Sequence, residues 1–426
     1  MSRIVIASLG FPLVIAFTTL SAQNNPIDAV ASDSPELASF GEYDIGVKTI
    51  EVVDRNRIDI INTPRGEASV HYDRKLTVEI WYPAELNEGQ KPRGEYKAIT
   101  RNPEITATLS GRAVRDAEAQ QADGPYPLII ISHGYPGNRF LMSHTGENLA
   151  SKGYVVASID HKDSTYDDQL AFASTLYNRP LDQRLVLKAL ASLSTQSDRF
   201  FSSMIDADNT GIVGYSMGGY GLVNNMGGGY SDEVTGSFMA PPNNLLQEHA
   251  TGNSAYRGNL DTRIKAGFAV APWGMNAGFW RPEDLAGVTV PTFYLAGDND
   301  TVAGYEEGTR AIYEGAINSD RYLLTFEGAG HNAGAPIPVP QEIIDTGDET
   351  GVEHYRDAVW DNLKMNNIMD HFVTAFFNFH LKGDEDSLAY LDIPTQESSS
   401  QGSAQLIGFE DGTDAGLILE MRTAEE

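Results

Sequence analysis

A glycine-flanked serine constrains this chain more than any other feature. The motif Gly214-Tyr215-Ser216-Met217-Gly218 directly follows an apolar run that is typical of a buried strand, and a helical pattern follows it. Glycines at these positions allow a sharp turn with close backbone packing, which exposes the central hydroxyl at the end of the strand. The motif therefore predicts that Ser216 is a nucleophile on a strand–turn–helix unit, rather than part of an ordinary glycine-rich turn.

The rest of the chain alternates between strand-like and helical patterns. Short apolar runs at residues 127–132, 154–159, 210–215, 264–271, 289–296 and 322–326 resemble strands that are buried on both faces. Helical patterns occupy residues 141–151, 181–193 and 353–381, and residues 105–119 also fit a helix. This alternation predicts an α/β fold with a mostly parallel, doubly wound sheet and helices on both faces.

The sequence also predicts a division into segments. A basic residue followed by an apolar run is typical of a signal peptide, which predicts export to the periplasm or secretion, with a retained anchor as the alternative. No stable insertion into a membrane is expected. The expected segments are a signal peptide at 1–22, a flexible N-terminal segment at 23–42, a catalytic domain at 43–382 with a possible cover insertion at 224–262, and an acidic C-terminal tail at 383–426.

Composition excludes several classes of function. Against 59 acidic residues there are 30 basic ones, a net charge of −29, which argues against binding to nucleic acid or to anionic lipid. The absence of cysteine excludes disulfides, cysteine-ligated zinc and a thiol nucleophile. The sequence Asp160-His161-Lys162-Asp163 is better explained by a turn after a strand than by a metal site. No metal or other cofactor is therefore predicted.

A nucleophilic serine needs a base and an acid. On a strand–turn–helix unit of this kind the acid and then the histidine follow the serine in the chain. Asp300 lies just past a predicted strand, and His331 lies in a glycine-rich loop after the next one. Asp298 is the alternative acid, although it is expected to shape the turn. His354, His371 and His380 lie in helical patterns and are expected to be surface or packing residues.

Acyl transfer also needs two donors for a developing oxyanion. One is expected to be the backbone N–H of Met217, next to the serine. The loop after residues 127–132 reads His133-Gly134-Tyr135, and it offers the N–H of Tyr135 as the second donor. His133 is expected to be a structural residue beneath this loop.

Two sets of motifs resemble known families. One set resembles platelet-activating-factor acetylhydrolases and dienelactone-hydrolase-like esterases: Trp-Tyr-Pro at 81–83, Ser-His-Gly at 132–134, Asp-His at 160–161 and the glycine-rich motif at 214–219. A second set is similar to bacterial cutinase-like polyester hydrolases: Ala-Pro-Trp at 271–273, Val-Thr-Val-Pro-Thr at 288–292, Asp-Thr-Val at 300–302, Tyr313 and Gly-Ala-Gly-His at 328–331. Together they cover roughly residues 76–331.

The resemblance implies an α/β-hydrolase fold and a serine esterase that forms an acyl-enzyme. In the cutinase-like group a tryptophan flanks the substrate cleft, and the match places Trp273 there, with Tyr135 at the aromatic donor position; a core role for Trp273 is the alternative. Three features depart from the families. The chain has no cysteine for a C-terminal disulfide, its insertion at 224–262 is longer, and dienelactone hydrolases use a cysteine nucleophile.

Several functions fit these features to different degrees. The preferred hypothesis is hydrolysis of a small-molecule or polymeric carboxylic ester, with polyester hydrolysis as a narrower reading. A prolyl-oligopeptidase-like peptidase is the nearest alternative, because the motif continues to Tyr220 as in those enzymes, but the N-terminal segment is too short for their extra β domain. A non-enzymatic binding module is disfavoured because serine, aspartate and histidine are all present.

Overall fold

The computed structural model describes residues 25–197, 199–391, 396–397 and 405–424. The predicted signal peptide at 1–22 lies outside the described residues. Within the described part of the chain, no helix combines the length and apolar character needed to cross a bilayer.

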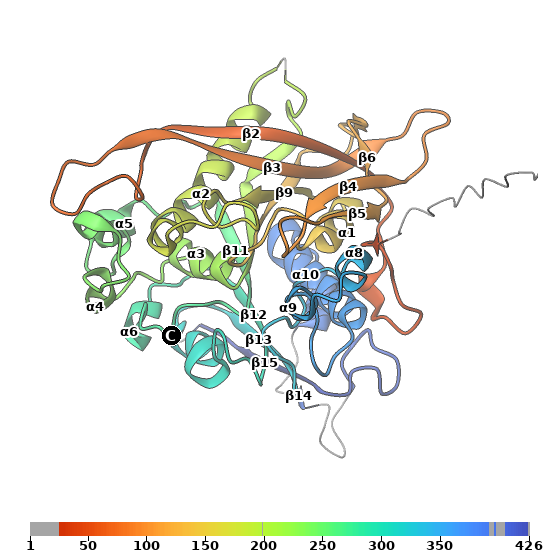
Figure 1. Cartoon of the computed structure of the whole chain (residues 1–426). Helices are drawn as coiled ribbons and strands as arrows, with labels where there is room; N and C mark the ends of the chain where they lie inside the picture. Colours follow the sequence, from red (N-terminus) through yellow and green to blue (C-terminus); the bar gives the residue numbers. More distant parts are fainter. Residues whose placement is uncertain (1–24, 198, 392–395, 398–404, 425–426) are drawn as a thin grey trace, which may run out of the picture.

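A long mixed sheet organises the fold (Figure 1). Its strands lie in the spatial order β14 (Gln396–Glu397), β15 (Leu417–Arg422), β13 (Arg321–Phe326), β12 (Thr292–Gly297), β11 (Ile264–Val270), β10 (Ile205–Tyr215), β8 (Tyr126–Ser132), β9 (Val155–Asp160), β3 (His71–Glu85), β2 (Asp44–Ile58) and β6 (Val114–Arg115), with β7 (Glu118–Ala119) paired to β3. The strands from β9 to β13 pair in parallel, whereas β3, β2 and β15 add antiparallel neighbours at the two sides. The predicted α/β architecture is confirmed.

Helices cover both faces of the sheet. They are α1 (Ser143–Ser151), α2 (Phe172–Ser194), α3 (Met217–Asn225), α4 (Asp232–Thr235), α5 (Ser254–Gly258), α6 (Pro282–Leu285), α7 (Ala311–Gly315), α8 (Gln341–Ile344), α9 (Glu349–Glu353) and α10 (Asn362–Lys382). Helical turns of the 3₁₀ or π type are η1 (Glu36–Ala38), η2 (Pro242–His249), η3 (Tyr305–Arg310) and η4 (Glu385–Tyr390).

The two faces of β8 show why the sheet is covered twice. Successive side chains on a strand point to opposite faces. Ile129 and Ile131 belong to the buried cluster that includes side chains of α1 and α10, whereas Leu128 and Ile130 belong to the cluster with α2 and α3. A continuous apolar run is therefore required, because neither face of this strand meets solvent.

The order of the parallel strands determines where a site can form. From β8 the chain passes through α1 to β9 on one side, and then through α2 to β10 on the other side of β8. Connections therefore leave β8 and β10 in opposite directions, and in open α/β sheets the crevice at such a point is the usual ligand site. The loops after β8 and β10 carry Tyr135 and Ser216, respectively.

Residues 105–119 are not helical, contrary to the sequence prediction. They form β5 (Thr106–Gly111), β6 and β7, and β5 lies between β1 (Asn25–Pro26) and β4 (Gly94–Ile99) in a small separate sheet. Burial alternates along β5, so Ala107 and Leu109 face the core while their neighbours face outward. Alternation with a period of two is typical of a strand. Here it is weak in the sequence because the residues of β5 are mostly small or polar.

The two ends of the described chain are also more ordered than predicted. Residues 25–42 were expected to be flexible, yet Ile27 and Ala38 are buried, and Ile27 N–H donates to the carbonyl of Ser110 at 2.9 Å. Residues 383–426 were expected to be an acidic tail outside the domain. Instead β15 pairs with β13 along its whole length, and Leu417 and Leu419 are fully buried. The predicted boundary at residue 382 is therefore too early.

The insertion at 224–262 contains α4, η2 and α5. It packs beside α3, where the ring of Tyr230 stacks on that of Tyr220 at a centroid distance of 5.0 Å. It also touches the connection between β2 and β3, since Arg65 donates to the carbonyl of Ala240 at 2.8 Å.

Candidate active site

Ser216 lies on a strained turn between β10 and α3. Its backbone has φ 52° and ψ −112°, and its residue exposure is 6%. A Cβ atom on Gly214 would lie 2.5 Å from the carbonyl oxygen of Gly218, and one on Gly218 would lie 1.8 Å from that of Ser132. Both glycines are therefore required for the turn that presents the serine.

The structure brings Ser216, His331 and Asp300 together. His331 Nε2 lies 3.0 Å from Ser216 Oγ, and His331 Nδ1 lies 2.8 Å from Asp300 Oδ2. Asp300 Oδ1 accepts hydrogen bonds from the N–H groups of Val302 and Ala303 at 2.8 and 3.1 Å. Burial opposes ionisation of Asp300, but the hydrogen bond with His331 and, to a smaller extent, the two backbone bonds hold its pKa below the ordinary range. Asp300 is therefore a carboxylate that can orient the imidazole.

The alternative acid, Asp298, has a different partner. Its Oδ1 accepts the N–H of Gly328 at 2.6 Å, which ties the end of β12 to the loop that carries His331. This contact agrees with the expectation that Asp298 shapes the turn.

Two backbone N–H groups are available beside Ser216. Met217 is the first residue of α3, so its N–H has no acceptor within the helix. The N–H of Tyr135 has no acceptor among the residues that the structure describes. Gly134 packs against the nucleophile, because a Cβ at that position would lie 3.3 Å from Ser216 Cβ. Both predicted oxyanion donors therefore belong to backbone segments that adjoin Ser216.

Aromatic side chains form a continuous group next to the serine. The N–H of Trp273 donates to the carbonyl of Ser216 at 3.1 Å, and the Trp273 side chain is half-buried. The ring of Phe172 contacts those of Tyr135 and Trp273, with centroid distances of 5.2 and 5.4 Å. Sequence reasoning missed Phe172, since nothing in its local pattern indicates a ring that bridges two distant segments.

A buried hydrogen-bond chain lies beneath this region. Ser132 Oγ is 2.8 Å from His161 Nε2, and His161 Nδ1 is 3.1 Å from Asp182 Oδ2. All three residues are at most 1% exposed, and burial lowers the pKa of His161 to about 3. Arg74 binds the same carboxylate at 2.8 Å, and it helps to hold the pKa of Asp182 well below its usual range despite burial. These groups support the site without access to a substrate.

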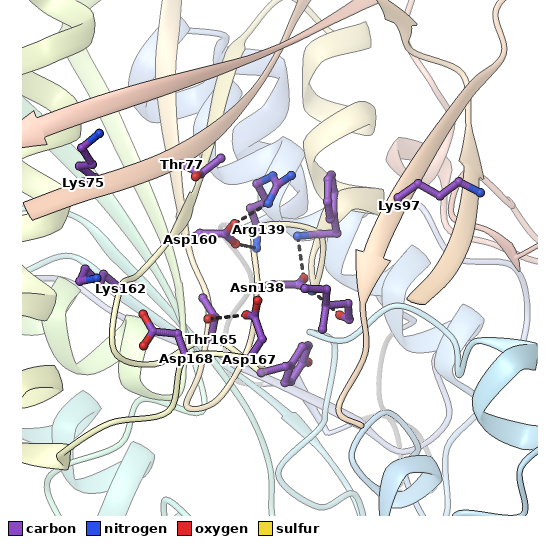
Figure 2. A pocket seen from close by; sticks show the side chains of 13 residues that line it. Lys75, Thr77, Lys97, Asn138, Arg139, Asp160, Lys162, Thr165, Asp167 and Asp168 are labelled. Atoms are coloured by element: carbon purple, nitrogen blue, oxygen red, sulfur yellow. Dashed lines mark hydrogen bonds and ion pairs between the residues drawn. The ribbon is translucent and has the colours of Figure 1, made fainter. Parts of the chain in front are cut away.

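A cavity of about 340 Å³ is lined by residues of β3, β4 and the segments that follow β8 and β9 (Figure 2). Neither Ser216, Asp300 nor His331 lines it. Some of its polar side chains bind one another: Arg139 pairs with Asp160, and Thr165 Oγ donates to Asp167 at 2.9 Å. Because none of the three candidate catalytic residues lines it, this cavity is not where the chemistry indicated by Ser216 would take place.

Comparisons with known proteins agree with the motifs. The family described as platelet-activating factor acetylhydrolase, isoform II, matches residues 79–187. Cutinase est2 of Thermobifida alba is 27% identical over 209 residues, which are 49% of this chain and 53% of that protein. Bis(hydroxyethyl) terephthalate hydrolase of Streptomyces coelicolor is 24% identical over 242 residues, which are 56% of this chain and 61% of that protein. The predicted resemblance is confirmed.

The matches differ in how much of each protein they cover. The chain spans only about half the length of the cutinases that it matches. A solved structure, the ferulic acid esterase from Streptomyces cinnamoneus, covers 88% of this chain and 97% of its own with a TM-score of 0.56 and 22% identity. That match shows a shared fold over most of the molecule.

Proposed function

We propose that this protein is a serine carboxylic-ester hydrolase with an α/β-hydrolase fold, and that Ser216, Asp300 and His331 are its catalytic triad. The observation that carries the proposal is the position of His331, which bonds Ser216 Oγ through one ring nitrogen and Asp300 through the other. The resemblance to cutinases and to the acetylhydrolase family supports the same chemistry.

In the first half of the reaction, Ser216 Oγ attacks the ester carbonyl carbon while His331 Nε2 takes the hydroxyl proton. Asp300 accepts the Nδ1–H of the ring, which keeps Nε2 free to act as the base and stabilises the imidazolium that forms. The carbonyl oxygen becomes an oxyanion and receives hydrogen bonds from the N–H groups of Tyr135 and Met217. The bond to the alcohol then breaks, and His331 gives the alcohol its proton.

The second half releases the acid. Water attacks the acyl-enzyme and gives a proton to His331, the same two N–H groups stabilise the new oxyanion, and the proton returns to Ser216 Oγ as the acid leaves. No metal or cofactor takes part in any step.

The substrate class is proposed from the surroundings of the serine. The half-buried aromatic group of Tyr135, Phe172 and Trp273 offers apolar surface to an acyl or alcohol group. A small-molecule or polymeric ester fits this surface, and the similarity to cutinases favours polyesters as the narrower class. Neither nucleic acid nor a membrane is proposed as a partner, and export from the cytoplasm remains our expectation.

The insertion at 224–262 is proposed as a cover that borders the cleft. Its Tyr230 stacks on Tyr220, whose ring lies 6.1 Å from that of Trp273. Deletion of the insertion is expected to change the preference for acyl-chain length, and an unchanged preference would contradict this role.

The test is a hydrolysis panel on protein that lacks residues 1–22. It compares p-nitrophenyl esters of increasing acyl length, a soluble aromatic polyester fragment and a peptide p-nitroanilide. Ester turnover is expected, and Ser216→Ala should abolish it, whereas the exposed control Ser32→Ala should keep it. Full ester activity in Ser216→Ala would refute the proposal, and turnover of the peptide alone would replace it with a peptidase.

A further inference from the structure

A buried arginine donates hydrogen bonds to the loop that carries Tyr135. Arg179 lies on α2 and is 1% exposed. One of its terminal nitrogens donates to the carbonyl of His133, and the other donates to Ser164 Oγ at 2.7 Å and to the carbonyl of Gly134 at 3.4 Å. All three acceptors are neutral, and two of them belong to the backbone of the loop.

The carbonyl of Gly134 has a second donor. The backbone N–H of His161 donates to His133 Nε2 at 3.2 Å, so the ring proton of neutral His133 must lie on Nδ1. His133 Nδ1 is 2.7 Å from the Gly134 oxygen and donates to it. Burial and the adjacent Arg179 keep the pKa of His133 well below its ordinary value, which preserves this neutral form. The Gly134 oxygen is thus held by two donors.

Holding this oxygen also orients the neighbouring N–H. The Gly134–Tyr135 peptide is trans, since the cis bonds of the described chain lie elsewhere. In a planar trans peptide the C=O and the N–H point in opposite directions. Donors that fix the Gly134 oxygen therefore fix the direction of the Tyr135 N–H, which has no acceptor among the described residues and lies beside Ser216.

The charge of Arg179 is not balanced by a contacting carboxylate. Among the described residues no aspartate or glutamate lies within ion-pair distance of it, whereas Arg57 and Arg74 both pair with Asp182. Burial lowers the pKa of Arg179 to about 9, and Asp182 offsets this only in part. A cation that donates to a peptide carbonyl polarises that peptide, and this makes its N–H a stronger donor to an anion.

We propose that Arg179 is the positioning residue of the oxyanion hole: it holds the Gly134–Tyr135 peptide so that the Tyr135 N–H faces the transition-state oxyanion. This inference rests on the proposed function, because it assigns a role within the same reaction. It predicts a loss in kcat with little change in KM, since the oxyanion exists only in the transition state. A purely structural arginine would affect stability and leave kcat of the folded protein unchanged.

The test compares Arg179→Lys with Ser164→Ala and a control. Lysine keeps the charge but lacks the planar fork that reaches two carbonyls and a hydroxyl. Loss of one oxyanion donor lowers kcat by about 10²–10³-fold, so Arg179→Lys is expected to lower it by about 10- to 100-fold with KM within about threefold. Ser164→Ala removes one contact of Arg179 and is expected to lower kcat several-fold; it carries the test if Arg179→Lys fails to fold.

The control is Arg57→Lys, which alters another buried arginine near α2 that makes no contact with the loop. It is expected to keep kcat within about twofold while lowering Tm. The rate at which a fluorophosphonate labels Ser216 is measured in parallel and should fall with kcat in the Arg179 and Ser164 variants.

The outcomes separate the two proposals. If wild-type protein is labelled at Ser216 but the Arg179 and Ser164 variants retain kcat and the labelling rate within twofold, the positioning role is overturned and the esterase stands. If wild-type protein is not labelled at Ser216 and hydrolyses no ester, the proposed function itself fails.

Discussion

Replacement of Asp300 by asparagine tests the site most sharply, because it changes the proton on His331 without changing shape. Two backbone donors, the N–H groups of Val302 and Ala303, face Asp300 Oδ1. In the variant the amide oxygen must accept these bonds, so the amide NH₂ faces His331 Nδ1. The ring must then carry its proton on Nε2, where it can no longer accept the proton of Ser216.

The expected fall in kcat follows from the free-energy cost of rotating the asparagine amide by 180°. A flip would break both backbone bonds, at about 1 kcal/mol each, and would place NH₂ against two donors. At least about 2 kcal/mol therefore disfavours the productive tautomer, a factor of about 30. Loss of the carboxylate that stabilises the imidazolium adds to this, and a total fall in kcat of about 10³–10⁴-fold is expected, or about 4–5.5 kcal/mol of transition-state stabilisation.

The assay is the steady-state hydrolysis of a p-nitrophenyl ester, with circular dichroism to confirm folding. The matched control is Asp298→Asn, since an asparagine oxygen can still accept the N–H of Gly328; its kcat should stay within about twofold of wild type. The reasoning is refuted if Asp300→Asn keeps more than a tenth of wild-type kcat, or if Asp298→Asn loses more activity than Asp300→Asn.

Three further predictions concern stability and the turn. Asp182→Asn leaves Arg74 without its closest buried carboxylate and should lower the free energy of unfolding by about 3–5 kcal/mol; because the folded pKa of Asp182 is depressed, the difference should be complete above about pH 5 and shrink in urea titrations as pH falls below the unfolded value of about 3.9. A pH-independent difference would contradict this linkage. Leu419→Ala should cost about 2–5 kcal/mol in the same titration, and a cost below 0.5 kcal/mol would mean that β15 does not pack as described. Gly218→Ala should abolish labelling of Ser216, since the new methyl group would meet the carbonyl of Ser132, and normal labelling would contradict the geometry of the turn.

Those parts of the candidate site that depend on local pattern could be predicted from the sequence. The glycines around Ser216 have no steric alternative, and the chain order of acid and base points to Asp300 and His331, which the structure brings to Ser216. The position of Asp300 past the end of the strand favours it over Asp298 as the acid. In the structure Asp300 contacts His331, whereas Asp298 accepts the N–H of Gly328.

What could not be predicted depends on contacts between distant segments. Phe172 bridges two aromatic residues that lie 37 and 101 positions away, and no local pattern encodes such a meeting. β15 follows an acidic, serine-rich stretch, and its few apolar residues become part of the core only because the strand pairs with β13. The strand at residues 106–111 resembles part of a helix in sequence because its buried positions include alanine and glycine and the positions between them hold threonine and serine, so the apolar–polar alternation is weak.

The buried chain of Ser132, His161 and Asp182 has a consequence for how active sites are recognised. A template search that scores only the order and spacing of donor and acceptor atoms would return two Ser–His–Asp matches in this protein, one around Ser216 and one around Ser132. Only the first has a strained backbone, a hydroxyl at a loop edge and free peptide N–H groups beside it. A serine-directed probe should therefore modify Ser216 and leave Ser132 unmodified. Chemical labelling would thus distinguish the two arrangements, which a comparison of atom positions alone would not.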